Sequence, residues 1–126
     1  MSEIKGIIDD IGILALENNI KIAALAVISN SGKLIHQTVN FDLEKQANIL
    51  LGAMNEEKSI KINDFEFIFE GNSSEGLIGT NKDGMGYLIL IPIEGGALVS
   101  YALPQAEPTK ALSFLKTYAV KLDGNL

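Results

Sequence analysis

The chain of 126 residues contains no cysteine and no arginine. Without cysteine it can form neither a disulfide nor a thiolate metal site. Without arginine it lacks the forked guanidinium group that binds phosphates and guanine bases through paired hydrogen bonds. All ten basic residues are lysines, and the net charge is −6. These features argue against nucleic acid as a partner.

Long apolar runs are also missing. No apolar stretch approaches the roughly 20 residues that a membrane-spanning helix needs. The start of the chain lacks the basic residues and apolar core of a signal peptide, and leads instead into an acidic helical pattern. The length is typical of one domain, so we expect a single domain over residues 1–126, located in the cytoplasm.

Hydrophobic periodicity predicts helices that alternate with strands. Apolar residues recur at helical spacing at 3–17, 42–55 and 108–122. Short apolar or alternating runs predict strands at 22–29, 33–39, 65–70, 87–93 and 97–103, and leave a further short strand at 76–80 open. Residues 55–61 are expected to form a charged connector. Because hairpin turns join the strands, we expect an antiparallel sheet with helices on its faces.

No arrangement of residues indicates catalysis, a cofactor or a bound metal. His36 is the single histidine, and no cysteine or second histidine accompanies it as a metal site requires. Gly71 and Gly76 have the glycine spacing of a phosphate-binding loop, but the lysine and hydroxyl that must follow are missing. The neighbouring acids Asp9 and Asp10 point about 100° apart on a helix, so they cannot converge as an acid–base pair. We therefore expect a protein that is not an enzyme.

The segment from Gly71 to Gly86 is rich in glycine and in turn-forming residues. Its five glycines give the backbone freedom, and the asparagine, serine and aspartate residues between them favour turns. We expect this segment to be a mobile connector or a bent hairpin at the edge of the sheet.

The second predicted helix, residues 42–55, has more apolar surface than one contact with a sheet can cover. Leaving such side chains in water forfeits roughly 1.5–3 kcal/mol each, which favours a partner. The alternative, a helix sunk into the core of a monomer, stays open. The predicted protein interface consists of Leu43, Gln46, Ala47, Ile49, Leu50, Ala53, Met54, Phe65, Phe67 and Phe69.

The order of these elements, together with their local patterns, resembles the roadblock/LC7 family, which includes dynein light chains. The matching stretches are the amphipathic opening helix, the hairpin at residues 23–35, the apolar second helix, and the hairpin at residues 86–103 with the helix that follows. The chain departs from the family at residues 72–85, where most members pass more directly between two strands.

The resemblance implies an α/β fold of the roadblock/LC7-like, profilin-like type. This fold is a five-stranded antiparallel sheet with helices on both faces, in the order α-β-β-α-β-(β)-β-β-α. The resemblance also implies a non-catalytic scaffold without a cofactor. The implied partners are a second copy of the chain (a homodimer) or a related roadblock subunit, and a small Ras-like GTPase or a motor or signalling complex.

Two functions from different classes are open at this point. A scaffold of this kind could not donate an arginine finger to a GTPase, because the chain has no arginine. The alternative is a ligand-sensing α/β module with a pocket between sheet and helix. Its support is thin, since the apolar positions suffice to fill one core.

Overall fold

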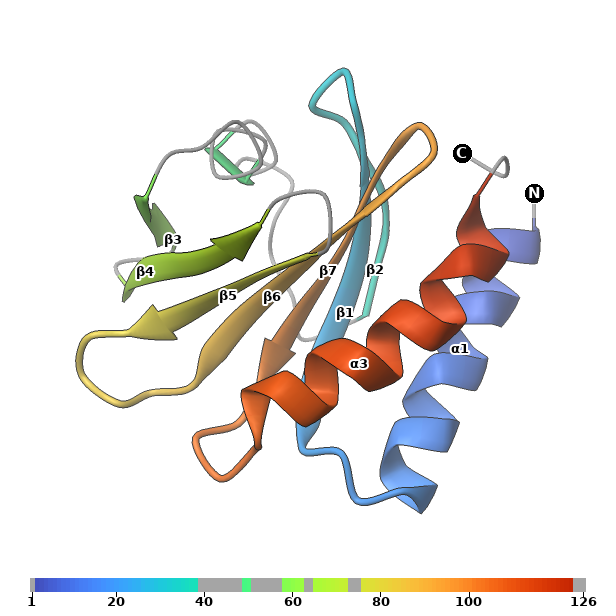
Figure 1. Cartoon of the computed structure of the whole chain (residues 1–126). Helices are drawn as coiled ribbons and strands as arrows, with labels where there is room; N and C mark the ends of the chain where they lie inside the picture. Colours follow the sequence, from blue (N-terminus) through green and yellow to red (C-terminus); the bar gives the residue numbers. More distant parts are fainter. Residues whose placement is uncertain (1, 39–48, 51–57, 63–64, 73–75, 124–126) are drawn as a thin grey trace.

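The computed structural model describes residues 2–38, 49–50, 58–62, 65–72 and 76–123 (Figure 1). In chain order the elements are α1 (Ser2–Glu17), β1 (Ile22–Ser29), β2 (Leu34–Gln37), β3 (Ser59–Ile62), β4 (Phe65–Asn72), β5 (Gly76–Asn81), β6 (Tyr87–Ile93), β7 (Gly96–Ala102), α3 (Pro108–Ala119) and the 3-10 turn η1 (Val120–Leu122). The first and last predicted helices and the strands at both predicted hairpins are confirmed.

Seven strands within the described residues form one antiparallel sheet, in the order β2-β1-β7-β6-β5-β4-β3. The expectation of five strands is therefore wrong. One unexpected strand is β3, which lies in the predicted charged connector. Ile60 and Ile62 of β3 are buried, while Ser59 and Lys61 are exposed. This alternation spans only four residues, too few to distinguish a strand from a charged loop in the sequence.

The glycine-rich segment contains β5, which lies between β4 and β6 and not at an edge of the sheet. The expectation of an edge connector is therefore wrong for residues 76–81. Gly79 shows why a glycine is present inside this strand. It pairs with Phe69 across the ladder, and a Cβ atom at this position would lie 2.7 Å from a carbon of the Phe69 ring. The glycine makes room for the ring instead of providing flexibility.

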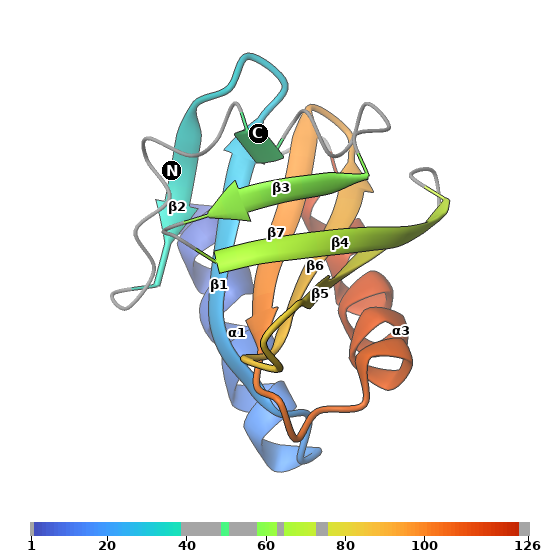
Figure 2. The same ribbon diagram turned by 90° about the vertical axis from the view of Figure 1, so that its left-hand side faces the viewer.

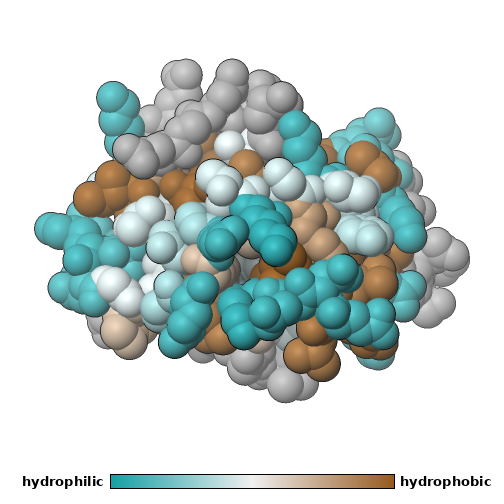
Figure 3. All heavy atoms as spheres, turned by 60° about the horizontal axis from the view of Figure 1, so that its bottom comes forward, coloured by the Kyte–Doolittle hydropathy of each residue, from teal (hydrophilic) through white to brown (hydrophobic). Residues whose placement is uncertain are grey.

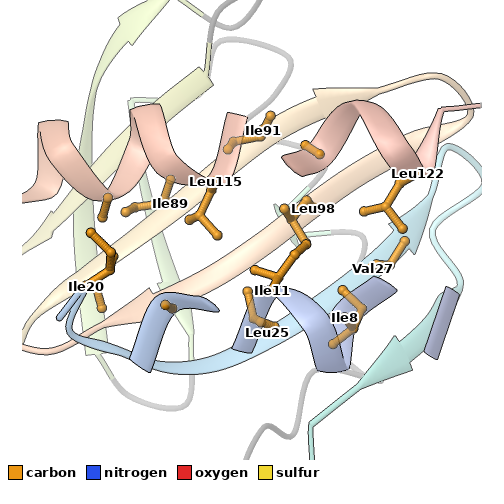
Figure 4. Packing of buried hydrophobic residues seen from close by; sticks show 14 of the residues in the cluster. Ile8, Ile11, Ile20, Leu25, Val27, Ile89, Ile91, Leu98, Leu115 and Leu122 are labelled. Carbon is orange, nitrogen blue, oxygen red and sulfur yellow. The ribbon is translucent and has the colours of Figure 1, made fainter. Parts of the chain in front are cut away.

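Side chains of the sheet alternate between two apolar clusters, one on each face. On the face that we call outer, α1 and α3 lie side by side (Figure 1). Figure 4 shows how residues of both helices meet strand residues there. The outer cluster includes Ile8, Ile11, Leu25, Val27, Ile89, Ile91, Leu98, Leu115 and Leu122.

On the opposite, inner face the sheet curls over itself, and β3 and β4 pass across β1 and β7 (Figure 2). The second cluster fills this curl with residues that include Ala26, Ile28, Ile60, Ile62, Phe67, Phe69, Leu77, Leu88, Leu90 and Val99. The curl lets strands from one end of the sheet close over its middle.

The second predicted helix, residues 42–55, lies outside the described residues except for Ile49 and Leu50. These two residues are helical, and Leu50 is fully buried in the inner cluster. This places the Leu50 side chain on the face opposite to α1 and α3, as expected for a helix on the second face.

The hydroxyl group of Ser100 is buried in the outer core and has no hydrogen-bond partner among the described residues. Its strand neighbours Leu25 and Ile89 are both apolar. We expect Ser100→Ala to raise the free energy of unfolding by about 1 kcal/mol, because an unpaired buried hydroxyl costs desolvation energy. Urea denaturation measures the change. The reciprocal variant Ala102→Ser adds a hydroxyl to the same face of β7 and should be destabilising; a less stable Ser100→Ala variant would contradict the prediction.

Candidate functional site

The outer face of the sheet is only partly covered by helices. Helix α3 packs against β5, β6 and β7, whereas β3 and β4 lie beyond it (Figure 1). The strand register identifies the side chains exposed there. Ile78 pairs with Ile89 of the outer cluster, so Thr80, two residues further on, also points outward. Ile68 pairs with Thr80 and is therefore on the same outer side.

The pairing of β3 with β4 extends this surface to the edge of the sheet. Ser59 pairs with Ile68 and Lys61 pairs with Glu66. Lys82, which follows β5, places its Nζ atom 3.7 Å from a carboxylate oxygen of Glu66. We call this surface the open face and define it by Ser59, Lys61, Glu66, Ile68, Thr80 and Lys82.

Ile68 lies at the centre of the open face and is 44% exposed, whereas its neighbours Phe67 and Phe69 are buried in the inner cluster. Around it are charges of both signs from Lys61, Glu66 and Lys82. The exposed ion pair contributes little to stability, because water screens it and ordering its side chains costs entropy. A single exposed apolar side chain is common on protein surfaces, but an apolar centre with a charged rim is also the layout of a protein contact surface.

A second surface lies along α1. A shallow groove of about 420 Å³ separates α1 from β1 and the end of β2, and Leu16 at its rim is 83% exposed. The residues that line it are Ile8, Asp9, Gly12, Ile13, Leu16, Leu25 and Thr38. In the view from below, hydrophobic side chains form small separate patches between hydrophilic ones (Figure 3). The described residues in this view therefore form no broad apolar surface that would mark a binding site.

The described ranges contain no group of three or more histidine, cysteine or acidic side chains that could hold a metal ion. His36 is half-buried on β2, where it pairs with Val27. None of the helices in these ranges has the length and apolarity needed to span a bilayer.

The residues predicted to form an interface do not come together on one surface. Leu43, Gln46, Ala47, Ala53 and Met54 lie outside the described residues. Leu50, Phe67 and Phe69 are buried in the inner cluster of the chain itself. Ile49 and Phe65 are 39% and 43% exposed, and an interface role for them stays a prediction.

The sequence reasoning missed Ile68. It treated the phenylalanines of β4 as the candidate contact surface, since they form the apolar side of the alternation. The signal in the sequence lay on the other side of the strand. There Ile68 is a single apolar residue between Glu66 and Glu70. The residues on that side of β4 have no apolar cluster to fill, so Ile68 stays exposed.

The fold is that of the profilins. Profilin IB of Acanthamoeba castellanii superposes with a TM-score of 0.69 over 86% of this chain and 94% of its own, at 17% identity. Loki profilin-1 of Lokiarchaeum sp. (strain GC14_75) is 37% identical over 134 residues, which cover 97% of each chain. The structure of a LokiProfilin2/rabbit actin complex gives a TM-score of 0.87, at 31% identity and with at least 99% of each chain covered. No family model matches the sequence.

The chain belongs to the profilin family, on the basis of its identity to Loki profilin-1 over nearly the whole of both chains. The resemblance to the roadblock/LC7 family is therefore wrong. The expected functions as a scaffold for a small Ras-like GTPase and as a ligand-sensing module are wrong with it, as are the expected homodimer and roadblock partners. Profilins are not enzymes, which confirms the expectation of a non-enzymatic protein.

The error has a physical origin in the patterns that were compared. The compared patterns were an opening helix, two hairpins and a closing helix. They reflect how helices cover a curled antiparallel sheet, and they include no residue that performs chemistry. Such patterns report layers and periodicity, which unrelated families share. The segment at residues 72–85, where the chain departs from the roadblock pattern, contains the whole of β5, a strand in the interior of this sheet.

The opposite exposures of neighbouring residues in β4 give a test of the open face. Ile68→Lys should change the free energy of unfolding by less than about 0.5 kcal/mol, as is usual for exposed positions. Phe67→Lys should leave the chain unfolded or severely destabilised, because it places an unpaired charge in the inner cluster. Thermal unfolding followed by circular dichroism compares the two. Equal destabilisation by both variants would show that Ile68 is not on an exposed face.

Proposed function

We propose that this chain is a non-catalytic actin-binding protein and that the open face is its actin-contacting surface. The observation that carries the proposal is its close similarity to a Loki profilin whose structure is that of a complex with rabbit actin. In this proposal one domain, spanning residues 1–126, binds actin in the cytoplasm, because it must share actin's compartment.

The chemistry of the open face supports this choice of surface. A stable protein–protein contact needs roughly 800 Å² on each partner, with an apolar centre and a polar rim. The outer sides of β3, β4 and β5 provide a continuous surface with Ile68 at its centre. Lys61 and Lys82 place positive charge there on a chain whose net charge is −6. Glu66 beside these lysines adds a carboxylate, so the rim fits a partner surface that presents charges of both signs, and complementary charges would fix the orientation of the complex.

The groove along α1 fits this role less well. Among the described residues it is lined by one side of α1 together with Leu25 and Thr38. A groove of this shape can hold a narrow chain but offers little area to a globular partner. The open face instead spans three strands, and its backbone is fixed by ladder hydrogen bonds, so binding would order few main-chain groups.

Two isoleucines on strands far apart in the order of the sheet allow a matched test. Ile68 on β4 and Ile35 on β2 are 44% and 36% exposed. We expect Ile68→Glu to weaken binding to rabbit actin at least about 30-fold, the effect of removing a central contact residue. Ile35→Glu adds the same charge at a similarly exposed site and should bind like the unmodified chain.

Isothermal titration calorimetry with monomeric actin measures both dissociation constants, and circular dichroism checks that both variants are folded. If the unmodified chain does not bind actin, the proposed function is wrong. If Ile35→Glu weakens binding while Ile68→Glu does not, the function stands but the contact surface lies elsewhere.

A further inference from the structure

The turn between β5 and β6 is held by one buried amide side chain. Asn81 is 3% exposed. Its Nδ2 group donates to the backbone carbonyl of Glu66 at 3.0 Å, which ties the turn to β4. Its Oδ1 atom accepts hydrogen bonds from the backbone amides of Asp83 and Met85, each at 3.0 Å. One side chain thus connects the neighbouring strand with two points of the turn.

The other end of the turn is held from β7. The hydroxyl group of Tyr101 donates a hydrogen bond to the backbone carbonyl of Met85. The close approach of this ring requires a glycine at position 86. The Gly86 backbone has φ +122°, and a Cβ atom there would collide with the carbonyl oxygen of Ala102 and with the Tyr101 ring. Residues other than glycine rarely adopt this backbone conformation.

Met85 is therefore fixed by its backbone while its side chain faces solvent. Its amide is bonded to Asn81 and its carbonyl to Tyr101, yet the residue is 47% exposed. Nearly half of the Met85 surface is left in water, and this apolar part contributes no hydrophobic stabilisation to the fold. A residue whose backbone is already fixed loses little main-chain entropy when a partner covers it. Methionine also adapts its shape to an irregular surface.

The turn continues the open face at one end of the sheet. Thr80 on the open face immediately precedes Asn81, and Lys82 in the turn reaches back to Glu66. Figure 1 shows the turn joining β5 to β6 on the side of the molecule where β3 and β4 lie. A partner that covers Ile68 and the charges around it would thus extend to this turn.

We propose that Met85 is a contact residue for actin, and that Asn81 and Tyr101 are positioning residues that hold it in place. This inference rests on the proposed function of the open face. It adds a second apolar contact to Ile68 and assigns a role to a tyrosine that lies on the other side of the sheet, in contact with the inner cluster.

The test is a double-mutant cycle on actin binding. Met85→Ala should raise the dissociation constant for rabbit actin about tenfold. Tyr101→Phe keeps the ring and removes only the hydroxyl that bonds Met85, and it should weaken binding several-fold, with faster hydrogen exchange at residues 83–86. In the Met85→Ala background the same tyrosine change should have no further effect, because its role is exerted through Met85.

Two further variants separate the possible outcomes. Val120→Ala trims an exposed aliphatic residue on η1, 62% exposed, and should not alter binding. Ile68→Glu reports on the open face itself. If Ile68→Glu abolishes binding and Met85→Ala does not weaken it, this inference is wrong and the proposed function stands. If Tyr101→Phe weakens binding equally in both backgrounds, the positioning role is wrong. If the unmodified chain does not bind actin, both proposals fail together.

Discussion

The pairing of β7 with β1 on one side and β6 on the other is the interaction on which the rest of the structure depends. β7 joins a strand from the start of the chain to one from its second half, with seven residue pairs in each ladder. Its side chains alternate between the two cores: Leu98 enters the outer cluster and Val99 the inner one. Both clusters thus share one strand, and a shift by one residue would exchange them.

The position of the open face follows from this arrangement. The outer side of β1, β6 and β7 must be covered, because most of its residues are apolar, and α1 and α3 provide the cover. Further along the sheet the outer side needs no cover, because the outer residues of β3 and β4 are polar or charged apart from Ile68. The inner side of the same strands remains apolar and is covered by the curl of the sheet. A surface free for a partner is left where the helices end.

Much of the fold could be predicted from the sequence, because its strongest signals are periodic. The stripe of Ile4, Ile8 and Ile11 defines α1, and the runs at residues 22–29, 87–93 and 97–103 define the central strands. The strands at residues 59–62 and 76–81 were harder to predict from the sequence, because the first is short and the second contains glycines. Gly79 looks like a flexible point in the sequence, and only the cross-strand contact with the Phe69 ring gives it a structural purpose.

The site could not be predicted, because it depends on which side of a strand is covered. The alternation in β4 separates Phe67 from Ile68, but the sequence does not tell which side meets a core. The phenylalanine side is buried within the chain, which leaves the less apolar side exposed. The role of the turn at residues 81–86 could not be predicted either, because it depends on contacts between distant parts of the chain. Asn81 is a common turn residue, and its role becomes visible only when its bonds to Glu66, Asp83 and Met85 are known.

The most direct test of the account is amide hydrogen exchange of the chain with and without saturating monomeric actin. The account predicts slower exchange in the presence of actin for the backbone of β4 around Ile68 and for residues 82–86, with no change in β2 or along α1. Protection confined to α1 and β2 would place the partner in the groove beside α1 and would contradict the assignment of the open face.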